Sequence, residues 1–252
     1  MFRRILVLGF AVVLIADAAF YATLPDVKPL RTSWPKTTAF IESRKVELAR
    51  AGEPTRVEWV PVPISRISPH LRRAVVAAED ARFYEHDGVD WEAIRGALEK
   101  DWEKRRLSAG ASTITQQLAK NLYLSSARTP WRKLKEWAIT RRLERLLPKE
   151  RILELYLNVV ELGRRTYGVE AAARRYFGKS AASLTPREAA MLAAMLPSPR
   201  IYDPVRHASR LERRARRILR WMRAVESPTP IRSRLPEATP SPVFPTPPLP
   251  SD

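Results

Sequence analysis

The chain has 252 residues, enough to bury one good-sized core, and it contains no cysteine, which excludes disulfides and thiolate zinc sites. Its 45 Lys and Arg residues against 27 Asp and Glu residues give a formal net charge of +18. Such a charge favours an anionic partner, so we expect nucleic acid, an acidic membrane surface or a phosphorylated substrate.

The first predicted element is a membrane span. Met1 to Arg4 carries two arginines and precedes Ile5 to Leu24, which has about the 20 apolar residues that cross a bilayer. Basic residues before the span predict a cytoplasmic N-terminus and a chain that continues outside the cytoplasm. Asp17 is costly inside a bilayer. Two alternatives stay open: a signal peptide cleaved after Ala16-Asp17-Ala18, and a buried soluble helix.

Residues 25–56 are expected to form a juxtamembrane linker, because prolines interrupt them. One short helix is predicted near Phe40 to Ala51, and an extended stretch at Val57 to Val62. From Ser68 onward the apolar residues recur at helical spacing, as in Trp91, Ile94, Ala97, Leu98 and Trp102. The sequence therefore predicts a mainly α-helical fold with little strand.

Two helices are predicted near the C-terminus. Thr185 followed by Pro186 is typical of a helix N-cap and first turn, opening a small-residue helix from Glu188 to Leu196. Arg206 to Val225 is predicted to be a basic amphipathic helix. The nine prolines that follow predict an extended, disordered tail. The chain is thus divided into an anchor (1–24), a linker (25–56), a helical domain (57–226) and a tail (227–252).

The stretch from Glu79 to Asn121 is the most informative part of the chain. It opens with an acidic pair, an aromatic residue and a His-Asp-Gly turn, and it ends with a small-residue loop that runs into Gln-Gln and Lys. These segments are too polar to fill a core, and they indicate a site for a sugar hydroxyl and a phosphate. Five blocks extend the pattern: Glu79-Asp-x-x-Phe83-x-x-His86-x-Gly88, Gly110-x-Ser-Thr-Ile-Thr-Gln-Gln117-x-x-Lys120-Asn121, Arg132-Lys133-x-x-Glu136, Lys149-x-x-Ile152-Leu-Glu-x-Tyr156-Leu-Asn158 and Gly168-x-x-x-Ala-Ala-x-x-Tyr176-Phe177-x-Lys179.

With these five blocks in order, the chain resembles the monofunctional biosynthetic peptidoglycan glycosyltransferases, whose family also supplies the glycosyltransferase domain of bifunctional penicillin-binding proteins. The resemblance covers roughly residues 57–203. It implies a lysozyme-like fold with a large and a small lobe after one transmembrane helix. The implied activity is polymerisation of lipid II into β-1,4-linked glycan strands, with release of undecaprenyl pyrophosphate, on the outer side of the bacterial cytoplasmic membrane.

The resemblance also implies the partners. These are lipid II, the growing glycan chain, the membrane and other cell-wall synthesis proteins, and nucleic acid and organic cofactors are not expected. The motifs of a transpeptidase are missing, since the single Ser-x-x-Lys is Ser33-Trp-Pro-Lys36 and no Lys-Thr-Gly follows. Two other function classes stay as alternatives: a lysozyme-like glycan-cleaving enzyme, and a membrane-tethered basic binding protein.

Glu79 is the candidate general base, because a carboxylate within hydrogen-bond reach can take the proton of the acceptor hydroxyl. The alternative is a helix cap or an ion pair with Arg72 or Arg82. Asp80 is expected to brace the loop, and His86 to make a turn contact. Three further residues of the first two blocks are expected to support the site: Phe83, Ser112 and Thr113.

A cluster of cations is expected to hold the departing pyrophosphate. Residues 128–151 carry nine Lys or Arg against three acids. By resemblance the substrate-binding residues are Gln117, Lys120, Arg128 and Lys133, with Arg132 in support. The remaining cations of this run, Lys135, Arg141, Arg142 and Arg145, are interpreted as a solvated helix face.

Glu136 is the second candidate catalytic carboxylate. Its match in the family is essential, and it either orients cations or holds a divalent metal ion near the pyrophosphate. An ion pair with Arg132 is the structural alternative. Mg²⁺ or Mn²⁺ is plausible because hard cations bind carboxylate and phosphate oxygens, although no dedicated set of metal ligands is recognisable.

Overall fold

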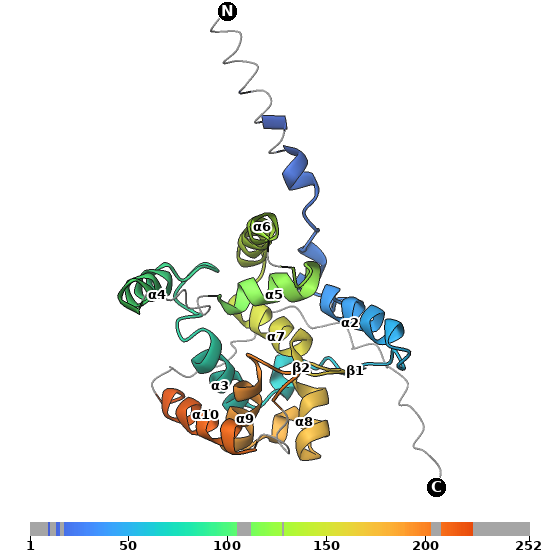
Figure 1. Ribbon diagram of the computed structural model, residues 1–252, viewed down its shortest axis with the longest axis vertical. Helices are drawn as coiled ribbons and strands as arrows, with labels where there is room; N and C mark the ends of the chain where they lie inside the picture. Colours follow the sequence, from blue (N-terminus) through green and yellow to red (C-terminus); the bar gives the residue numbers. More distant parts are fainter. Residues whose placement is uncertain are drawn as a thin grey trace, which may run out of the picture.

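The computed structural model describes residues 10, 14–15, 18–104, 112–127, 129–202 and 208–223. This part of the chain is mainly helical, which confirms the prediction of a mainly α-helical fold (Figure 1). The α-helices are α2 (Ala39–Arg50), α3 (Pro69–Glu79), α4 (Trp91–Lys104), α5 (Ile114–Tyr123), α6 (Pro130–Leu146), α7 (Lys149–Val159), α8 (Val169–Phe177), α9 (Pro186–Met195) and α10 (Ala208–Trp221). Short 3-10 helices are η1 (Lys28–Arg31), η2 (Ile64–Arg66) and η3 (Ala181–Ser183). Arg128, the Gly110 loop and the tail from Ser227 lie outside the described residues.

Local capping decides where the helices begin. The Thr185 side chain accepts from the Glu188 N–H while the Glu188 side chain accepts from the Thr185 N–H, and Pro186 occupies the first turn. The predicted start of this helix is thus confirmed, although α9 opens two residues before Glu188. Thr113 caps α5 in the same reciprocal way with Gln116. The predicted basic helix is α10, whose buried face includes Leu211, Ala215 and Ile218.

Three short strands form one small sheet, which the sequence pattern barely indicated. They are β1 (Glu58–Trp59), β2 (Glu161–Gly163) and β3 (Thr166–Tyr167), in the order β1-β3-β2. β1 is parallel to β3, and β2 is antiparallel to it. Strands of two or three residues are too short to show the alternation of apolar and polar residues that reveals a strand in a sequence.

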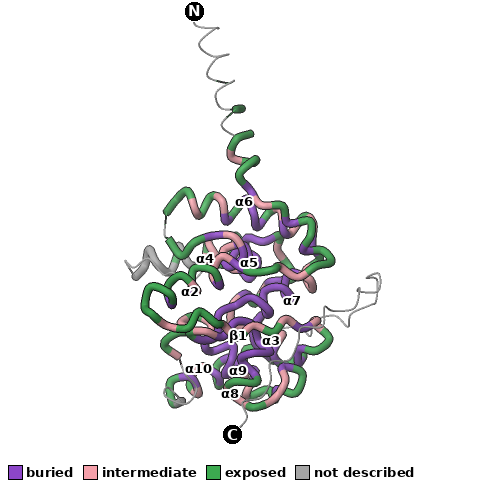
Figure 2. The backbone as a smooth tube through the Cα atoms, turned by 90° about the vertical axis from the view of Figure 1, so that its right-hand side faces the viewer, coloured by how far each residue is buried: buried purple, intermediate pink, exposed green. Residues whose placement is uncertain are grey.

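The core is built around α7, in which every residue from Ile152 to Val159 is buried. α5 lies between α6 and α7, while α9 packs against α3 and α10 (Figure 1). The buried backbone accordingly runs through the middle of the molecule (Figure 2). The finer prediction of a large and a small lobe stays a prediction.

The segment expected to be a linker, residues 25–56, packs on this core. Val27 and Leu30 are buried, and α2 buries Ile41 and Leu48. The Arg142 guanidinium donates to the carbonyls of Tyr21, Leu24 and Pro25, at 3.2 to 3.4 Å. The interpretation of Arg142 as part of a solvated face is therefore wrong, because it attaches the incoming chain to α6.

The predicted membrane span falls largely outside the described residues, of which 10, 14–15 and 18–24 belong to it. Within the described part of the chain, no helix has both the length and the apolar character needed to cross a bilayer.

Asn158 ties α7 to the segment between β1 and α3, and we expect its loss to destabilise the fold. Its side chain accepts from the Val62 N–H at 2.7 Å and donates to the Val62 carbonyl at 2.9 Å, and it is fully buried. Asn158→Ala leaves both backbone groups without these partners, so the free energy of unfolding should fall by about 3 kcal/mol. Urea denaturation of the purified variant measures the change, and a loss below about 0.5 kcal/mol would contradict this role.

Candidate active site

Glu79 is the last residue of α3, and its carboxylate faces α5. The Gln117 Nε2 donates to Glu79 Oε2 at 2.9 Å, and the Gln117 Oε1 in turn accepts from the Tyr156 hydroxyl at 3.0 Å. Burial raises the pKa of Tyr156 well above 10.0, so this hydroxyl keeps its proton and donates. The amide of Gln117 is therefore oriented with its NH₂ toward Glu79. Among the described residues the Glu79 carboxylate accepts from Gln117 and forms no ion pair with Arg72 or Arg82, and Arg82 pairs with Glu85 and Glu92 instead.

Asp80 fastens the loop after Glu79 to the start of α5. One carboxylate oxygen accepts from the Ile114 N–H at 3.0 Å, and the other lies 2.9 Å from His86 Nε2. A carboxylate at a helix N-terminus is favoured by the helix dipole. The Gly88 N–H donates to His86 Nδ1, so this ring nitrogen acts as an acceptor and carries no proton. In a neutral imidazole the proton is then on Nε2, which faces Asp80. His86 thus makes the expected turn contact.

Gly88 packs this loop against α6, and no other residue type fits at this position. Its φ is +87°, and a Cβ there would lie 2.6 Å from the Thr140 side chain and 2.8 Å from that of Glu144. The Thr113 hydroxyl, besides capping α5, donates to the Gly88 carbonyl at 2.7 Å. The two sequence blocks that flank α4 are thereby joined into one unit.

The other two supporting residues have different environments. Phe83 is completely buried, with the Lys149 ammonium 4.6 Å above its ring. Ser112 is exposed, and its backbone carbonyl lies 3.5 Å from Gln117 Nε2. Phe83 therefore supports the loop by packing in the core, whereas Ser112 contacts the site through its main chain.

The cation cluster gathers on α5 and α6. Arg132 and Lys133 both form ion pairs with Glu136, whose side chain is only 3% exposed. Lys120 interacts electrostatically with this triad and with Glu79, so the two candidate carboxylates share one environment. The ammonium of Lys120 lies 5.7 Å from the centre of the Phe40 ring and has no hydrogen-bond or ion-pair partner among the described residues. It is therefore free to bind an anion.

Glu136 does not fit the role of a metal ligand as it stands. Each of its carboxylate oxygens is already bonded to a cation, one to Arg132 and one to Lys133. A divalent ion would have to displace one of them. The geometry favours the other expected role, in which Glu136 orients cations for the pyrophosphate.

Burial raises the pKa of Glu79 above its ordinary value of 4.5. The hydrogen bond from Gln117 and the charges of Arg214 and Lys120 oppose this rise, while the charge of Asp80 adds to it. Arg214 belongs to α10, and among the described residues its buried Nε has no hydrogen-bond partner. Sequence reasoning missed Arg214 because it was one of many arginines in a basic helix, and it missed Tyr156 because it counted as an apolar residue of α7.

These pKa relations predict the pH dependence of the site. A base works only when ionised, so activity should fall on acidification at a higher pH than for an exposed Glu. Arg214→Gln removes a positive charge that favours the ionised form, so it should shift the acidic limb of kcat/KM to still higher pH. Arg213→Gln is the matched control, because its exposed side chain takes no part in the charges acting on Glu79. Superimposable acidic limbs for the two variants would exclude this role of Arg214.

Comparison with known proteins confirms the resemblance. The family model described as Transglycosylase matches residues 45–223, beginning inside α2. The chain is 50% identical over 196 residues to the biosynthetic peptidoglycan transglycosylase of Nitrosospira multiformis, covering 77% of this chain and 84% of that protein. It is 53% identical over 186 residues to the protein of the same name from Aromatoleum aromaticum, covering 73% of this chain and 80% of the relative. The chain belongs to the transglycosylase family.

Proposed function

We propose that the protein is a peptidoglycan glycosyltransferase that polymerises lipid II into β-1,4-linked glycan strands and releases undecaprenyl pyrophosphate. The observation that carries the proposal is that a carboxylate and a cation lie in the same site. A partly buried carboxylate, Glu79, is held by Gln117. Lys120, whose ammonium has no hydrogen-bond or ion-pair partner in the described part of the chain, lies within electrostatic reach of Glu79. The names of the relatives point to the same reaction.

The reaction assigns one role to each group. The acceptor sugar hydroxyl attacks the anomeric carbon of the donor, and its proton passes to Glu79 as the new C–O bond forms. The bond from that carbon to the pyrophosphate breaks, and the pyrophosphate leaves with the electron pair. Lys120 and the Arg132–Lys133–Glu136 triad stabilise the charge that develops on it. Gln117 keeps Glu79 in place through its amide NH₂.

No step of this scheme depends on a metal ion. A contribution of Mg²⁺ or Mn²⁺ is a separate prediction, and it would act on the pyrophosphate oxygens rather than on Glu136 as it is now paired. Polymerisation measured in EDTA and after adding back each metal tests it directly.

We place the enzyme at the outer face of the cytoplasmic membrane, with Ile5 to Leu24 as a single-pass anchor. Lipid II is itself anchored in the bilayer, so tethering raises the local enzyme concentration near the substrate.

Removal of residues 1–17 should leave a folded enzyme, because Phe20 still packs on Trp131 and Leu24 stays in the core. That variant should match the full chain on detergent-dispersed lipid II and lose activity on lipid II in vesicles. Equal activity in vesicles, or a mature N-terminus at Ala19 by mass spectrometry, would overturn the anchor.

Two substrates given to the purified full chain test the proposed reaction. Labelled lipid II should be converted to long glycan, and finished glycan should remain intact. Cleavage of finished glycan without polymerisation would assign a lysozyme-like hydrolase instead. Inertness toward both substrates, with binding to lipid alone, would assign a tethered binding protein.

A further inference from the structure

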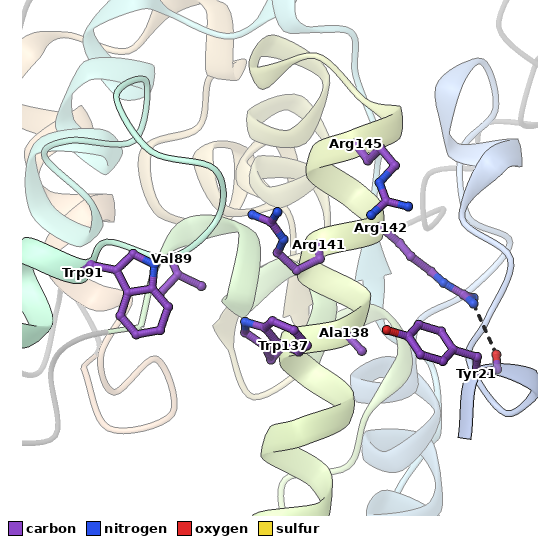
Figure 3. Close-up of a pocket in the computed structure, with 8 residues that line it drawn as sticks. All are labelled: Tyr21, Val89, Trp91, Trp137, Ala138, Arg141, Arg142 and Arg145. Carbon is purple, nitrogen blue, oxygen red and sulfur yellow. Dashed lines mark hydrogen bonds between the residues drawn. The ribbon is translucent and has the colours of Figure 1, made fainter. Parts of the chain in front are cut away.

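A cavity of about 560 Å³ lies between the start of α4, the outer face of α6 and the incoming N-terminal segment (Figure 3). Among the described residues, three arginines of α6 line it and no carboxylate does. The described lining is Tyr21, Val89, Trp91, Trp137, Ala138, Arg141, Arg142 and Arg145. None of these residues belongs to the candidate active site, so the cavity requires its own explanation.

Two of the three guanidinium groups are available to a ligand. Arg142 is engaged with the carbonyls of the incoming chain. To the residues that the structure describes, Arg141 makes one long hydrogen bond, 3.4 Å to the Asp87 carbonyl. Arg145 has no hydrogen-bond or ion-pair partner within the described ranges. Two exposed cations in one cavity with no acid in the lining favour an anionic group, and guanidinium groups suit phosphate oxygens in particular.

The walls of the cavity suit an amphipathic ligand rather than a free anion. Trp91 is 67% exposed and Trp137 is 42% exposed, and the side chain of Tyr21 forms part of the opposite wall (Figure 3). Trp and Tyr are the residues that gather at the level of lipid headgroups. Toward the N-terminus of α6, Trp131 and Leu134 are also exposed, so the apolar surface extends beyond the cavity.

The position of the cavity points to a membrane. Phe20 packs on Trp131 with ring centres 5.1 Å apart, and Tyr21 lines the cavity, so the predicted anchor leaves the molecule beside this face of α6. Any lipid surface that the anchor enters would therefore face Trp137, Arg141 and Arg145.

We propose that this cavity binds the headgroup of an anionic phospholipid, with Arg141 and Arg145 on the phosphate and Trp91 and Trp137 beside the glycerol and upper acyl chains. The bound lipid would be a second ligand, separate from the glycan substrate. It would fix how α6 and the active site are oriented at the bilayer. The proposal uses the proposed function only for the membrane location, and it can be tested without glycan synthesis.

Native mass spectrometry of the full chain in neutral detergent measures the binding, with phosphatidylglycerol and phosphatidylcholine of identical acyl chains as probes. Arg141→Gln/Arg145→Gln should weaken phosphatidylglycerol binding by roughly 25-fold, since each basic residue near an anionic lipid contributes about a fivefold factor. Arg213→Gln/Arg216→Gln is the matched control, because it removes the same charge from exposed positions of α10. Binding by the control should change by less than about threefold.

The outcomes separate the possible ligands. Preference for phosphatidylglycerol that is lost in the α6 variant alone supports the proposal. Equal losses in both variants, or equal binding of the two lipids, would overturn it. Displacement by inorganic phosphate would show a free-phosphate site, and displacement by a short oligonucleotide would show a nucleic-acid surface. The α6 variant should still polymerise lipid II in detergent, so failure of the lipid site and failure of the proposed reaction give different results.

Discussion

Glu79→Gln is expected to lower the rate of lipid II polymerisation by about 100-fold or more, since a general base contributes about 10²–10⁴ to a rate. The substitution keeps the shape of the side chain and can still accept the hydrogen bond from Gln117, but it cannot take a proton at the working pH. Because the site is otherwise intact, lipid II binding should be nearly unchanged. Steady-state polymerisation and equilibrium binding, measured on the same preparation, separate the two effects.

Glu85→Gln is the control for this variant. Glu85 lies in the same loop, and its side chain is 63% exposed and paired with Arg82 at the surface. Surface pairs of this kind contribute little, so activity should stay close to that of the unmodified enzyme. If Glu79→Gln retained activity within a few-fold, Glu79 would have to be removed from the role of base.

Lys120→Met is expected to have the second large effect. Removal of one preorganised group that stabilises developing negative charge costs about 10²–10³ in rate. Lys120 suits this role because burial already lowers its pKa from 10.5, and no described residue satisfies its ammonium group. An approaching pyrophosphate would therefore replace water rather than an existing ion pair. The variant should fold as well as the parent, because a partly desolvated charge has been removed.

Two measurements check the role of Lys120. Polymerisation should fall as stated, and binding of a phosphoglycolipid such as moenomycin should weaken in parallel. Lys135→Met serves as the control on α6, where the Lys135 ammonium lies 5.9 Å from the centre of the Trp131 ring and has no hydrogen-bond or ion-pair partner among the described residues. Phosphoglycolipid binding that is insensitive to Lys120→Met would place the phosphate site elsewhere.

The helices were predictable because the signals that form them act over a few residues. The caps of α5 and α9 each join residues three apart, and the apolar spacing of α7 follows the helical period. The candidate base, the Gln of α5 and the cations of α6 were assigned from the resemblance of the five sequence blocks to those of the family. Each of these inferences depends on neighbours along the chain.

Contacts between distant segments could not be predicted in this way. The hydrogen bond from Tyr156 to Gln117 spans 39 residues, and that from Arg142 to Leu24 spans 118. Along the chain, Tyr156 stands among apolar residues and Arg142 stands in a run of cations, so neither residue shows its distant partner. The packing of residues 25–56 on the core was missed for the same reason, because prolines indicate local irregularity and carry no information about what a segment packs against.

The sequence by itself determined the helical class, the starts of α2 and α9, the family and the types of residue that the site contains. Tertiary structure alone decided which charges face which. It set the charge of Arg214 near Glu79, and it left Lys120 without an ion-pair partner among the residues that the structure describes. It also placed both oxygens of Glu136 against cations. The physical reason is that capping and periodicity act along the chain, whereas burial and Coulomb interactions depend on distances that exist only after the helices have packed.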